Sequence, residues 1–239
     1  RSSKLQYRAS YARGFRAPTI KELFLEFIDF NHNIVGNSEL EAEYSHAFNS
    51  SIVYTPYQKD TKYIQIDIQG SLQYLNNKID LAQIENTTGY TYFNISNAKY
   101  YGLNTTIDSK VSKSSKIRLG WNVYKTELNE SLDPTRFQNI SFLYKYFNSQ
   151  HKFSANINLK YTPEITSQRY QDNELVSVKQ EPFESINLNF NKTFIKLNST
   201  LSLGIKNLTN LKNINSLGGG IHSSSESILS WGRTFFINL

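Results

Sequence analysis

The sequence predicts an all-β protein whose strands form an antiparallel β-barrel that spans a membrane. Apolar and polar residues alternate with a period of two along most of the chain. The alternating segments are longer than the roughly five or six residues of a typical globular strand. They match the roughly nine to eleven residues of a strand that crosses a bilayer at a tilt. The connections are alternately long and short, as in outer-membrane barrels, where short turns and long loops occupy opposite sides.

Ten strands are expected, and two segments show the alternation most clearly. In 63–79, Ile64, Ile66 and Ile68 alternate with polar residues, and in 151–162 Phe153 and Ile157 do the same. Such strands present one apolar face and one polar face. The ten expected strands are 3–14, 43–56, 63–79, 91–111, 116–126, 140–147, 151–162, 182–194, 197–209 and 232–239.

The connections are sorted by length in strict alternation. The short ones are polar tight turns, such as the Ser-rich stretch between Lys110 and Lys116. The long ones carry most of the acidic residues, which concentrate in 15–42 and 163–181. The segment 15–42 shows no continuous strand pattern, which suits a mobile lid that contacts a ligand. Because Pro18 precedes an apolar run, a short helical turn is expected over Thr19 to Phe27.

The two faces have a physical interpretation in a membrane. The apolar face is expected to meet lipid, and the polar face, rich in Asn, Gln, Ser and Thr, is expected to line a watery lumen. Aromatic residues gather at strand ends, which is typical of interfacial girdles; the strand propensity of Tyr and Phe is the alternative explanation. They are Tyr54, Tyr57, Tyr63, Tyr74, Tyr100, Tyr101, Tyr161, Phe194 and Phe235.

Composition excludes several classes of protein. The chain of 239 residues has no cysteine, so it has neither a disulfide framework nor a thiolate metal site. The net charge of +6 comes from scattered basic residues, so no nucleic-acid partner is expected. The sequence contains neither a Gly-x-Ser-x-Gly elbow nor a phosphate-binding Gly-rich loop, so we expect no enzyme activity. An outer-membrane hydrolase is the enzymatic alternative.

Two sequence boxes flank the first long connection and carry a family resemblance. The stretches "RGFRAPT" and "GNSELEAE" resemble paired boxes of the TonB-dependent outer-membrane receptors, with Ser38 where that family usually has Pro. "GIKNLTNLKN" over 204–213 and "GRTFFINL" over 232–239 resemble the last strands of the same family. The matching motif residues are Phe15, Arg16, Ala17, Pro18, Gly36, Asn37, Leu40 and Glu43.

This resemblance implies both an architecture and a location. Receptors of this family look like barrels of about 22 strands closed by an N-terminal plug, so 1–239 would be the C-terminal part of the barrel, its last ten strands. The plug and the earlier strands are expected to be absent from this chain and to be its partners. The remaining expected partners are membrane lipid, the TonB complex acting through the plug, and a surface lipoprotein. The expected location is the bacterial outer membrane, as a multi-pass protein.

The resemblance also implies active import of a scarce nutrient, for which haem or another iron complex is the leading candidate. Cobalamin, a siderophore or another nutrient, and a passive porin-like barrel, are the alternatives. In the haem-transporting branch a histidine of this loop looks like an axial iron ligand, and here that histidine is His32. Haem would be a transported ligand, with no cofactor bound permanently. The expected ligand-binding residues are His32, Phe30, Asn31, Asn33, His222 and Tyr170, with Phe27 as a further stacking surface.

Two other interpretations of the first long connection stay open. The "NHN" stretch around His32 is equally consistent with an Asn-rich turn that binds nothing. The acidic side chains at irregular spacing are a weak Ca²⁺ candidate, because calcium takes oxygen ligands. They are Glu22, Glu26, Asp29, Glu39 and Glu41.

Overall fold

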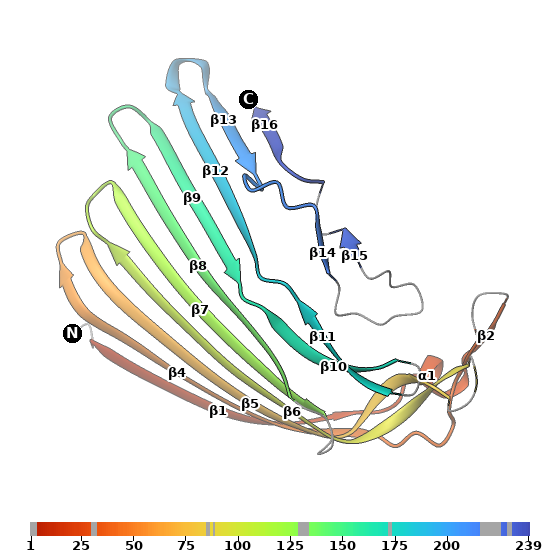
Figure 1. The fold of residues 1–239 in the computed structure, drawn as a ribbon. Coiled ribbons are helices and arrows are strands. Elements are labelled where there is room, and N and C mark those ends of the chain that lie inside the picture. The colour runs from red at the N-terminus through yellow and green to blue at the C-terminus, as the bar shows by residue number, and fades with distance from the viewer. Residues whose placement is uncertain are drawn as a thin grey trace.

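A computed structural model (Figure 1) describes residues 4–29, 33–84, 87, 89–128, 134–171, 174–215, 226–228 and 231–239. Almost all of the secondary structure in these ranges is strand, and no helix in them is long and apolar enough to cross a membrane. The elements are β1 Leu5–Arg16, α1 Ile20–Phe24, β2 Glu26–Ile28, β3 Asn33–Val35, β4 Glu43–Lys59, β5 Lys62–Gln83, β6 Tyr90–Lys110, β7 Ser115–Leu128, β8 Thr135–Asn148, β9 Phe153–Thr162, β10 Ile165–Gln171, β11 Glu174–Gln180, β12 Phe183–Phe194, the 3-10 helix η1 Ile195–Leu197, β13 Ser199–Lys206, β14 Asn213–Asn215, β15 Glu226–Ile228 and β16 Thr234–Asn238.

Ten of the strands form one curved antiparallel sheet in the order β1-β4-β5-β6-β7-β8-β9-β12-β13-β16. Each of these ten strands pairs with the ones that precede and follow it in this order, as in an up-and-down barrel. The strands missing from the order belong to the long connections. The ten expected strands are therefore confirmed, both in number and in neighbours. In Figure 1 the short turns lie together at one end of the strands, which we call the short-turn end. The helix α1 and the hairpins β2–β3 and β10–β11 lie at the opposite end of the strands, which we call the long-loop end.

The strand boundaries differ from the expected ones in informative places. The strand predicted to break at Gly14 continues to Arg16, where Phe15 pairs with Tyr44 and Arg16 with Glu43. It ends just before Pro18, which lacks the N–H that a ladder needs. The strands β5 and β6 also run further than expected, to 22 and 21 residues. The expected connection 80–90 thereby shrinks to 84–89, because the hairpin stays paired up to Gln83 and Tyr90.

Three of the long connections contain a hairpin that the sequence did not predict. The first holds β2 and β3, the one after β9 holds β10 and β11, and the last holds β14 and β15. The segment 15–42, which has no continuous strand pattern, thus contains two strands of three residues each. Its strand β3 even joins the main sheet, because Ile34 and Val35 pair in parallel with Tyr90 and Thr91 of β6.

Three of the short turns contain a residue with a left-handed backbone. Asp60, Lys152 and Asn198 have φ of 51°, 50° and 46°, which suits tight hairpins. Beside the first turn the pairing of β4 with β5 shifts between Tyr54 and Tyr57. Pro56 lies in this bulge, where a residue without an N–H does not interrupt the ladder. The expected short turns are thus confirmed.

Cross-strand pairing shows that the sheet has two chemically distinct faces, because directly paired residues project from the same side. One face is apolar across the strands, and the opposite face is rich in amides, with Asn104, Asn122 and Asn139 paired in a row. A representative row on the apolar face is Ile66, Ile107, Leu119, Phe142, Leu159 and Ile186.

Large side chains of the apolar face are exposed. Phe48 is 46% exposed and Trp121 is 43% exposed, although both lie within strands. A soluble monomer rarely exposes a contiguous apolar surface larger than a few hundred Å². This face therefore requires a cover. Among the predicted girdle residues, Tyr63 and Tyr100 are an exception, because they pair with Lys110 and Gln73 on the amide face.

Candidate functional site at the long-loop end

The first long connection is held to the sheet by a charged cluster that we call the loop anchor: Arg16, Glu22 and Glu43. The Arg16 guanidinium donates from Nε to Glu43 Oε2 at 2.7 Å and from Nη2 to Glu43 Oε1 at 2.8 Å. Its Nη1 donates to both oxygens of Glu22, at 3.0 and 2.9 Å. Bidentate, charge-assisted hydrogen bonds are the strongest kind available to side chains. Arg16 thus joins β1, α1 and β4 at one point.

The anchor continues into the backbone on both sides. Glu43 Oε1 also accepts the amide of Ile79 in β5 at 2.6 Å. Glu22 Oε2 accepts the amide of Thr19 at 2.7 Å, while Thr19 Oγ1 accepts the amide of Glu22 at 3.2 Å. This reciprocal pair is a capping box, which starts α1 directly after Pro18. The expected helical turn is therefore confirmed, although it ends at Phe24.

The ionisation of Glu22 follows from these contacts. Burial raises the pKa of its carboxyl, but the Thr19 amide and the Arg16 guanidinium outweigh burial and hold the pKa below the usual 4.5. The carboxylate is therefore ionised at neutral pH. Because the folded pKa is depressed, its stabilising effect is present above pH 4.5 and is lost as the pH falls through the lower, folded value.

The second box closes the loop from the other side. A Cβ added at Gly36 would lie 2.6 Å from Phe24 N and 2.7 Å from Leu23 C and Leu25 N. Only glycine allows this approach to the backbone of α1. The Gly36 amide donates to Leu25 O at 2.6 Å, and the Asn37 amide donates to Glu22 O at 2.8 Å.

The remaining residues of this box fix it to the sheet. Asn37 Nδ2 donates to Tyr92 O of β6 at 3.0 Å, and Asn37 Oδ1 accepts the Glu39 amide at 2.9 Å. Leu40 is buried, with 9% of its surface exposed. Gly36, Asn37 and Leu40 therefore hold this end of the loop in place. Phe15 of the first box projects outward beside Tyr44, with 5.4 Å between the ring centroids.

A third attachment comes from Asn94 of β6, which sequence reasoning did not identify as a contact residue. Its Oδ1 accepts the Glu41 amide at 2.8 Å, and its Nδ2 donates to Glu41 O at 3.0 Å and to Asn77 O at 2.8 Å. Asn77 Nδ2 in turn donates to Glu41 Oε2 at 2.8 Å. One amide side chain thus serves three backbone groups, a role that the Asn-x-Ser sequence at this position did not reveal.

The amide face of the sheet is hydrogen-bonded within itself. Asn122 Nδ2 donates to Asn139 Oδ1 at 2.8 Å, and Tyr124 Oη donates to Asn104 Oδ1 at 2.8 Å. Nearer the short-turn end, Arg118 makes a bidentate pair with Asp108, with bonds of 2.9 and 2.8 Å. Toward the short-turn end this face also carries cations, since Lys116 pairs directly with Lys145. Its amides and charges suit contact with water or with a polar solute.

The residues predicted to bind ligand are only partly placed by the structure. His32, Phe30, Asn31 and His222 lie outside the described residues. Asn33 begins β3, opposite Ile28, at the top of the β2–β3 hairpin. Tyr170 lies in β10, one residue from the far end of the β10–β11 hairpin. Both described positions are thus at the long-loop end.

Two of the acidic residues considered for calcium have other partners. Glu22 belongs to the loop anchor, and Glu41 accepts from Asn77. Among the described residues, no group of three or more His, Cys, Asp or Glu side chains is placed to hold a metal ion. The described part of the loop therefore gives no support to a Ca²⁺ site.

Together, the ten-stranded up-and-down sheet and the anchored long loop define the wall of an antiparallel transmembrane β-barrel. The model of the TonB dependent receptor-like β-barrel family matches residues 2–208, so the chain belongs to that family. The predicted fold class and family are confirmed, and membership places the apolar face toward lipid and the amide face toward the lumen.

Solved structures agree with this architecture. The copper transporter OprC superposes with a TM-score of 0.72 at 15% identity and covers 99% of this chain. The ferric enterobactin receptor PfeA of Pseudomonas aeruginosa, in complex with enterobactin, gives 0.69 at 16% identity and 99% coverage. FpvA of P. aeruginosa, bound to pyoverdine and iron, gives 0.66 at 13% identity and 99% coverage. At these identities the likeness is one of fold.

The chain spans about a third of the length of those receptors: 36% of OprC, 38% of PfeA and 30% of FpvA. No curated protein matches the chain. The family and these neighbours are transport receptors, not enzymes.

Proposed function

We propose that this chain forms part of the barrel wall of an outer-membrane receptor that imports a nutrient actively, with TonB as the source of energy. The observation that carries the proposal is the loop anchor. Arg16 and Glu43 fix a long connection to the rim of a sheet whose lumenal face is amide-rich. A receptor needs such a fixed rim, because a binding vestibule built from loops loses affinity when the loops must be ordered on binding.

The class of cargo follows from the neighbours' own ligands. OprC is a copper transporter, PfeA binds enterobactin and FpvA binds ferric pyoverdine. All three ligands are metals or metal chelators, so a metal complex is the cargo that we propose here. The amide face supports passage of a polar solute, since it presents paired amides such as Asn122, whose Nδ2 donates to Asn139 Oδ1.

The edges of the sheet indicate which partners the wall needs. The strands β1 and β16 are the two ends of the sheet order. Unpaired backbone groups cost several kcal/mol each in hydrocarbon, so a membrane barrel has to be closed. We propose that the remaining strands of a barrel of about 22 strands close it, that a plug fills the lumen, and that TonB acts through the plug. A surface lipoprotein is the further partner that the long-loop end would accommodate.

Uptake by the complete receptor tests this proposal. Cells that express it would be supplied with ⁵⁵Fe chelates and with ⁶⁴Cu, with and without TonB. We expect uptake of at least one metal complex that is lost when TonB is deleted. Uptake that persists at the same rate without TonB would instead support the passive porin alternative.

Haem is the specific cargo that we propose, on the basis of His32 and His222 in two of the long connections. Neutral imidazole is a suitable ligand for iron. Hemin would be titrated into the complete receptor, His32→Ala and His222→Ala, with His151→Ala as a matched control in the short turn at the opposite end. We expect the Soret shift to be lost in His32→Ala and kept in the control. An unchanged spectrum and affinity in His32→Ala would reject haem ligation by this residue. Absence of a Soret shift in the wild type would reject haem and leave a siderophore or cobalamin as the cargo.

A further inference from the structure

Three lysines lie next to one another on the amide face near the short-turn end. Lys110 of β6 pairs directly with Lys116 of β7, and Lys116 pairs directly with Lys145 of β8. Residues opposite each other on adjacent antiparallel strands have Cβ atoms roughly 5 Å apart, and like charges in such pairs destabilise a sheet. Two consecutive pairs of this kind therefore require negative charge close by.

The nearest carboxylate does not supply enough of it. Asp108 accepts from Arg118 Nε and Nη2 at 2.9 and 2.8 Å, so both of its oxygens are occupied. Lys116 Nζ lies 3.4 Å from Asp108 Oδ1 and 6.0 Å from the centroid of the Tyr63 ring. In the described part of the chain, Lys145 has neither an ion pair nor a side-chain hydrogen bond. The charge of Lys145 is thus not neutralised there.

The imbalance of charge extends over this part of the amide face. From β5 to β9, three consecutive cross-strand rows contain five cations and two carboxylates: Lys110, Lys116, Arg118, Lys145, Lys160, Asp67 and Asp108. The next row toward the long loops contains Asn104, Asn122 and Asn139 and carries no charge. The positive potential along this wall therefore rises toward the short-turn end.

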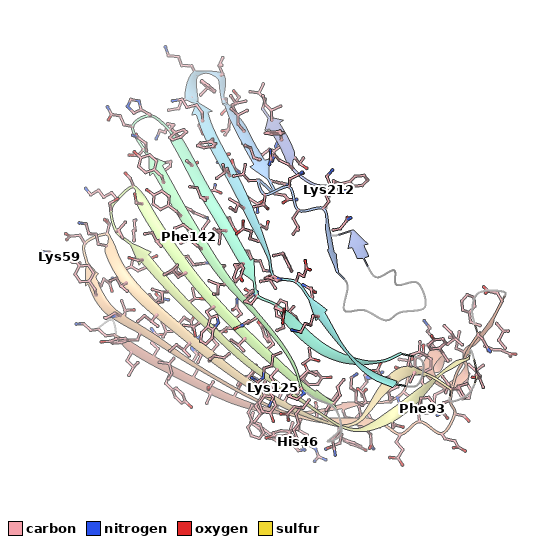
Figure 2. The ribbon with its side chains drawn as sticks, in the orientation of Figure 1. His46, Lys59, Phe93, Lys125, Phe142 and Lys212 are labelled. Atoms are coloured by element: carbon pink, nitrogen blue, oxygen red, sulfur yellow. The ribbon has the colours of Figure 1, made fainter. Side chains whose placement is uncertain are left out.

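A small cavity lies between these cations. It has a volume of about 60 Å³ and is lined by Lys116, Arg118, Leu143 and Lys145. Leu143 pairs directly with Arg118 and offers no polar side-chain atom, so three charged side chains border an apolar base. A single water needs about 10–15 Å³, so the cavity has room for one carboxylate or phosphate group. In Figure 2 the neighbouring residue Phe142 marks this position along β8.

We propose that this cavity is an anion site on the lumenal wall, and that it binds a carboxylate group of an anionic metal chelate near the end of its passage through the barrel. The neutral amide row has no charge to hold such a chelate, whereas Lys116, Arg118 and Lys145 lie close to the short turns, on the periplasmic side of a barrel. The cations therefore favour movement toward the exit. The inference deepens the proposed function and rests on it for the kind of cargo.

Residue-resolved acetylation of the complete receptor in detergent tests the site. The neutral reagent N-succinimidyl acetate modifies uncharged lysines, and mass spectrometry gives the rate at each position with and without citrate, which is the probe. A bound carboxylate favours the charged form of an ammonium, so citrate is expected to slow acetylation of Lys116 and Lys145 by about threefold or more. Lys113, exposed in a short turn, should be unaffected.

Two results of this measurement would overturn the proposal. Rates at Lys116 and Lys145 that are the same with and without citrate would show that the cavity takes no mobile carboxylate, and slow rates at both positions in each case would assign the cavity to a carboxylate of the plug. Protection by inorganic phosphate but not by citrate would also contradict a carboxylate site.

Substitutions at Lys145 remove no ion pair or hydrogen bond of the described residues. Lys145→Gln is expected to raise the citrate concentration for half-protection of Lys116 by about tenfold, the usual contribution of one charged hydrogen bond. Lys145→Glu places a carboxylate opposite Lys116, so Lys116 should react slowly from the start and citrate should have no effect. Lys113→Gln is the matched control and should behave like the wild type. Unchanged protection of Lys116 in Lys145→Glu would show that citrate acts elsewhere, against the proposal.

Uptake measurements separate this inference from the proposed function. Each metal chelate that the wild type takes up is also measured in Lys145→Gln, at saturating concentration. Anionic chelates are expected to enter severalfold more slowly than in the wild type, and cationic or neutral ones at the same rate. TonB-dependent uptake of anionic chelates at an unchanged rate, or uptake of cationic and neutral complexes alone, would overturn the exit site and leave the proposed function standing. Citrate protection in a receptor whose uptake does not need TonB would do the reverse.

Discussion

The two ends of the sheet are held together by different kinds of contact. At the short-turn end each turn is closed by local bonds, such as Val111 N to Ser115 O at 3.1 Å and Ser114 N to Ser112 Oγ at 3.1 Å. Backbone bonds such as Phe147 N to Ser114 O, at 2.8 Å, link neighbouring turns. At the long-loop end Arg16 reaches Glu43, 27 residues away, and Asn94 reaches Glu41, 53 residues away. Each short turn is therefore closed within a few neighbouring residues, whereas the rim depends on side chains that reach distant strands and forms only when those strands are aligned.

Removal of the Arg16 charge is expected to have the largest effect at the rim. Arg16→Gln deletes bidentate bonds to Glu22 and Glu43 and leaves two largely buried carboxylates facing each other, with 14% and 13% of their side chains exposed. We expect local opening of α1 to become easier by about 3 kcal/mol, since each charged hydrogen bond contributes about 1.5–3 kcal/mol. Hydrogen exchange of the Leu23 and Asn37 amides in the complete receptor measures this.

Arg16→Lys is the matched control for this change, because it keeps the charge but not the planar fork, and about half of the effect should remain. Protection of the Asn37 amide that is unchanged in Arg16→Gln would show that the loop is held without the anchor. Exchange in β8 and β9, several strands away from the loop anchor, should stay as in the wild type.

A substitution at Gly36 tests whether the close packing of the second box on α1 stabilises the rim, without changing any charge. Gly36→Ala places a methyl group against the backbone of α1, at 2.6 Å from Phe24 N. Overpacking typically costs about 1–3 kcal/mol, so we expect a loss of about 2 kcal/mol in the same exchange measurement. Gly70→Ala is the control with free space, and it should change the free energy of opening by less than about 0.5 kcal/mol. Equal effects of the two substitutions would contradict the close packing of the second box on α1.

A short-turn substitution should have the smallest effect. Ser112→Ala removes one side-chain hydrogen bond, to the Ser114 amide, in a turn where Val111 and Ser115 remain bonded. We expect a change of at most about 0.5 kcal/mol in the free energy of unfolding, measured by urea titration in detergent. A change as large as that of Arg16→Gln would remove the distinction between the two ends.

The sequence predicted the sheet better than the rim, and the reason is physical. Alternation such as that of Ile64, Ile66 and Ile68 is written into adjacent residues, so the ten strands and their order follow from it. Strand ends are decided by pairing partners. Arg16 extends β1 because Glu43 lies opposite, and Gln83 extends β5 because Tyr90 lies opposite. Neither partner is visible in the local pattern.

In the candidate site too, contacts between neighbouring residues were predictable from the sequence and contacts between distant residues were not. The capping box of Thr19 and Glu22 lies within four residues, and the short helix was predicted near its observed place. The bond from Arg16 to Glu43 joins the two family boxes, which the sequence identified as separate motifs without a contact between them. The binding role of His32, Asn33, His222 and Tyr170 stays a prediction.

The length of the β5–β6 hairpin has one more consequence. At about 3.3 Å per residue, half of the 22 residues of β5 suffice to cross a bilayer, and the rest, at a tilt of about 45°, rises roughly 25 Å above it. Because β3 and Asn37 are bonded to this hairpin, the first loop is attached to a projecting β-hairpin and does not lie on the lipid surface. An antibody fragment raised against the projecting part of the β5–β6 hairpin is therefore expected to stain intact cells, even where surface sugars conceal the rest of the barrel.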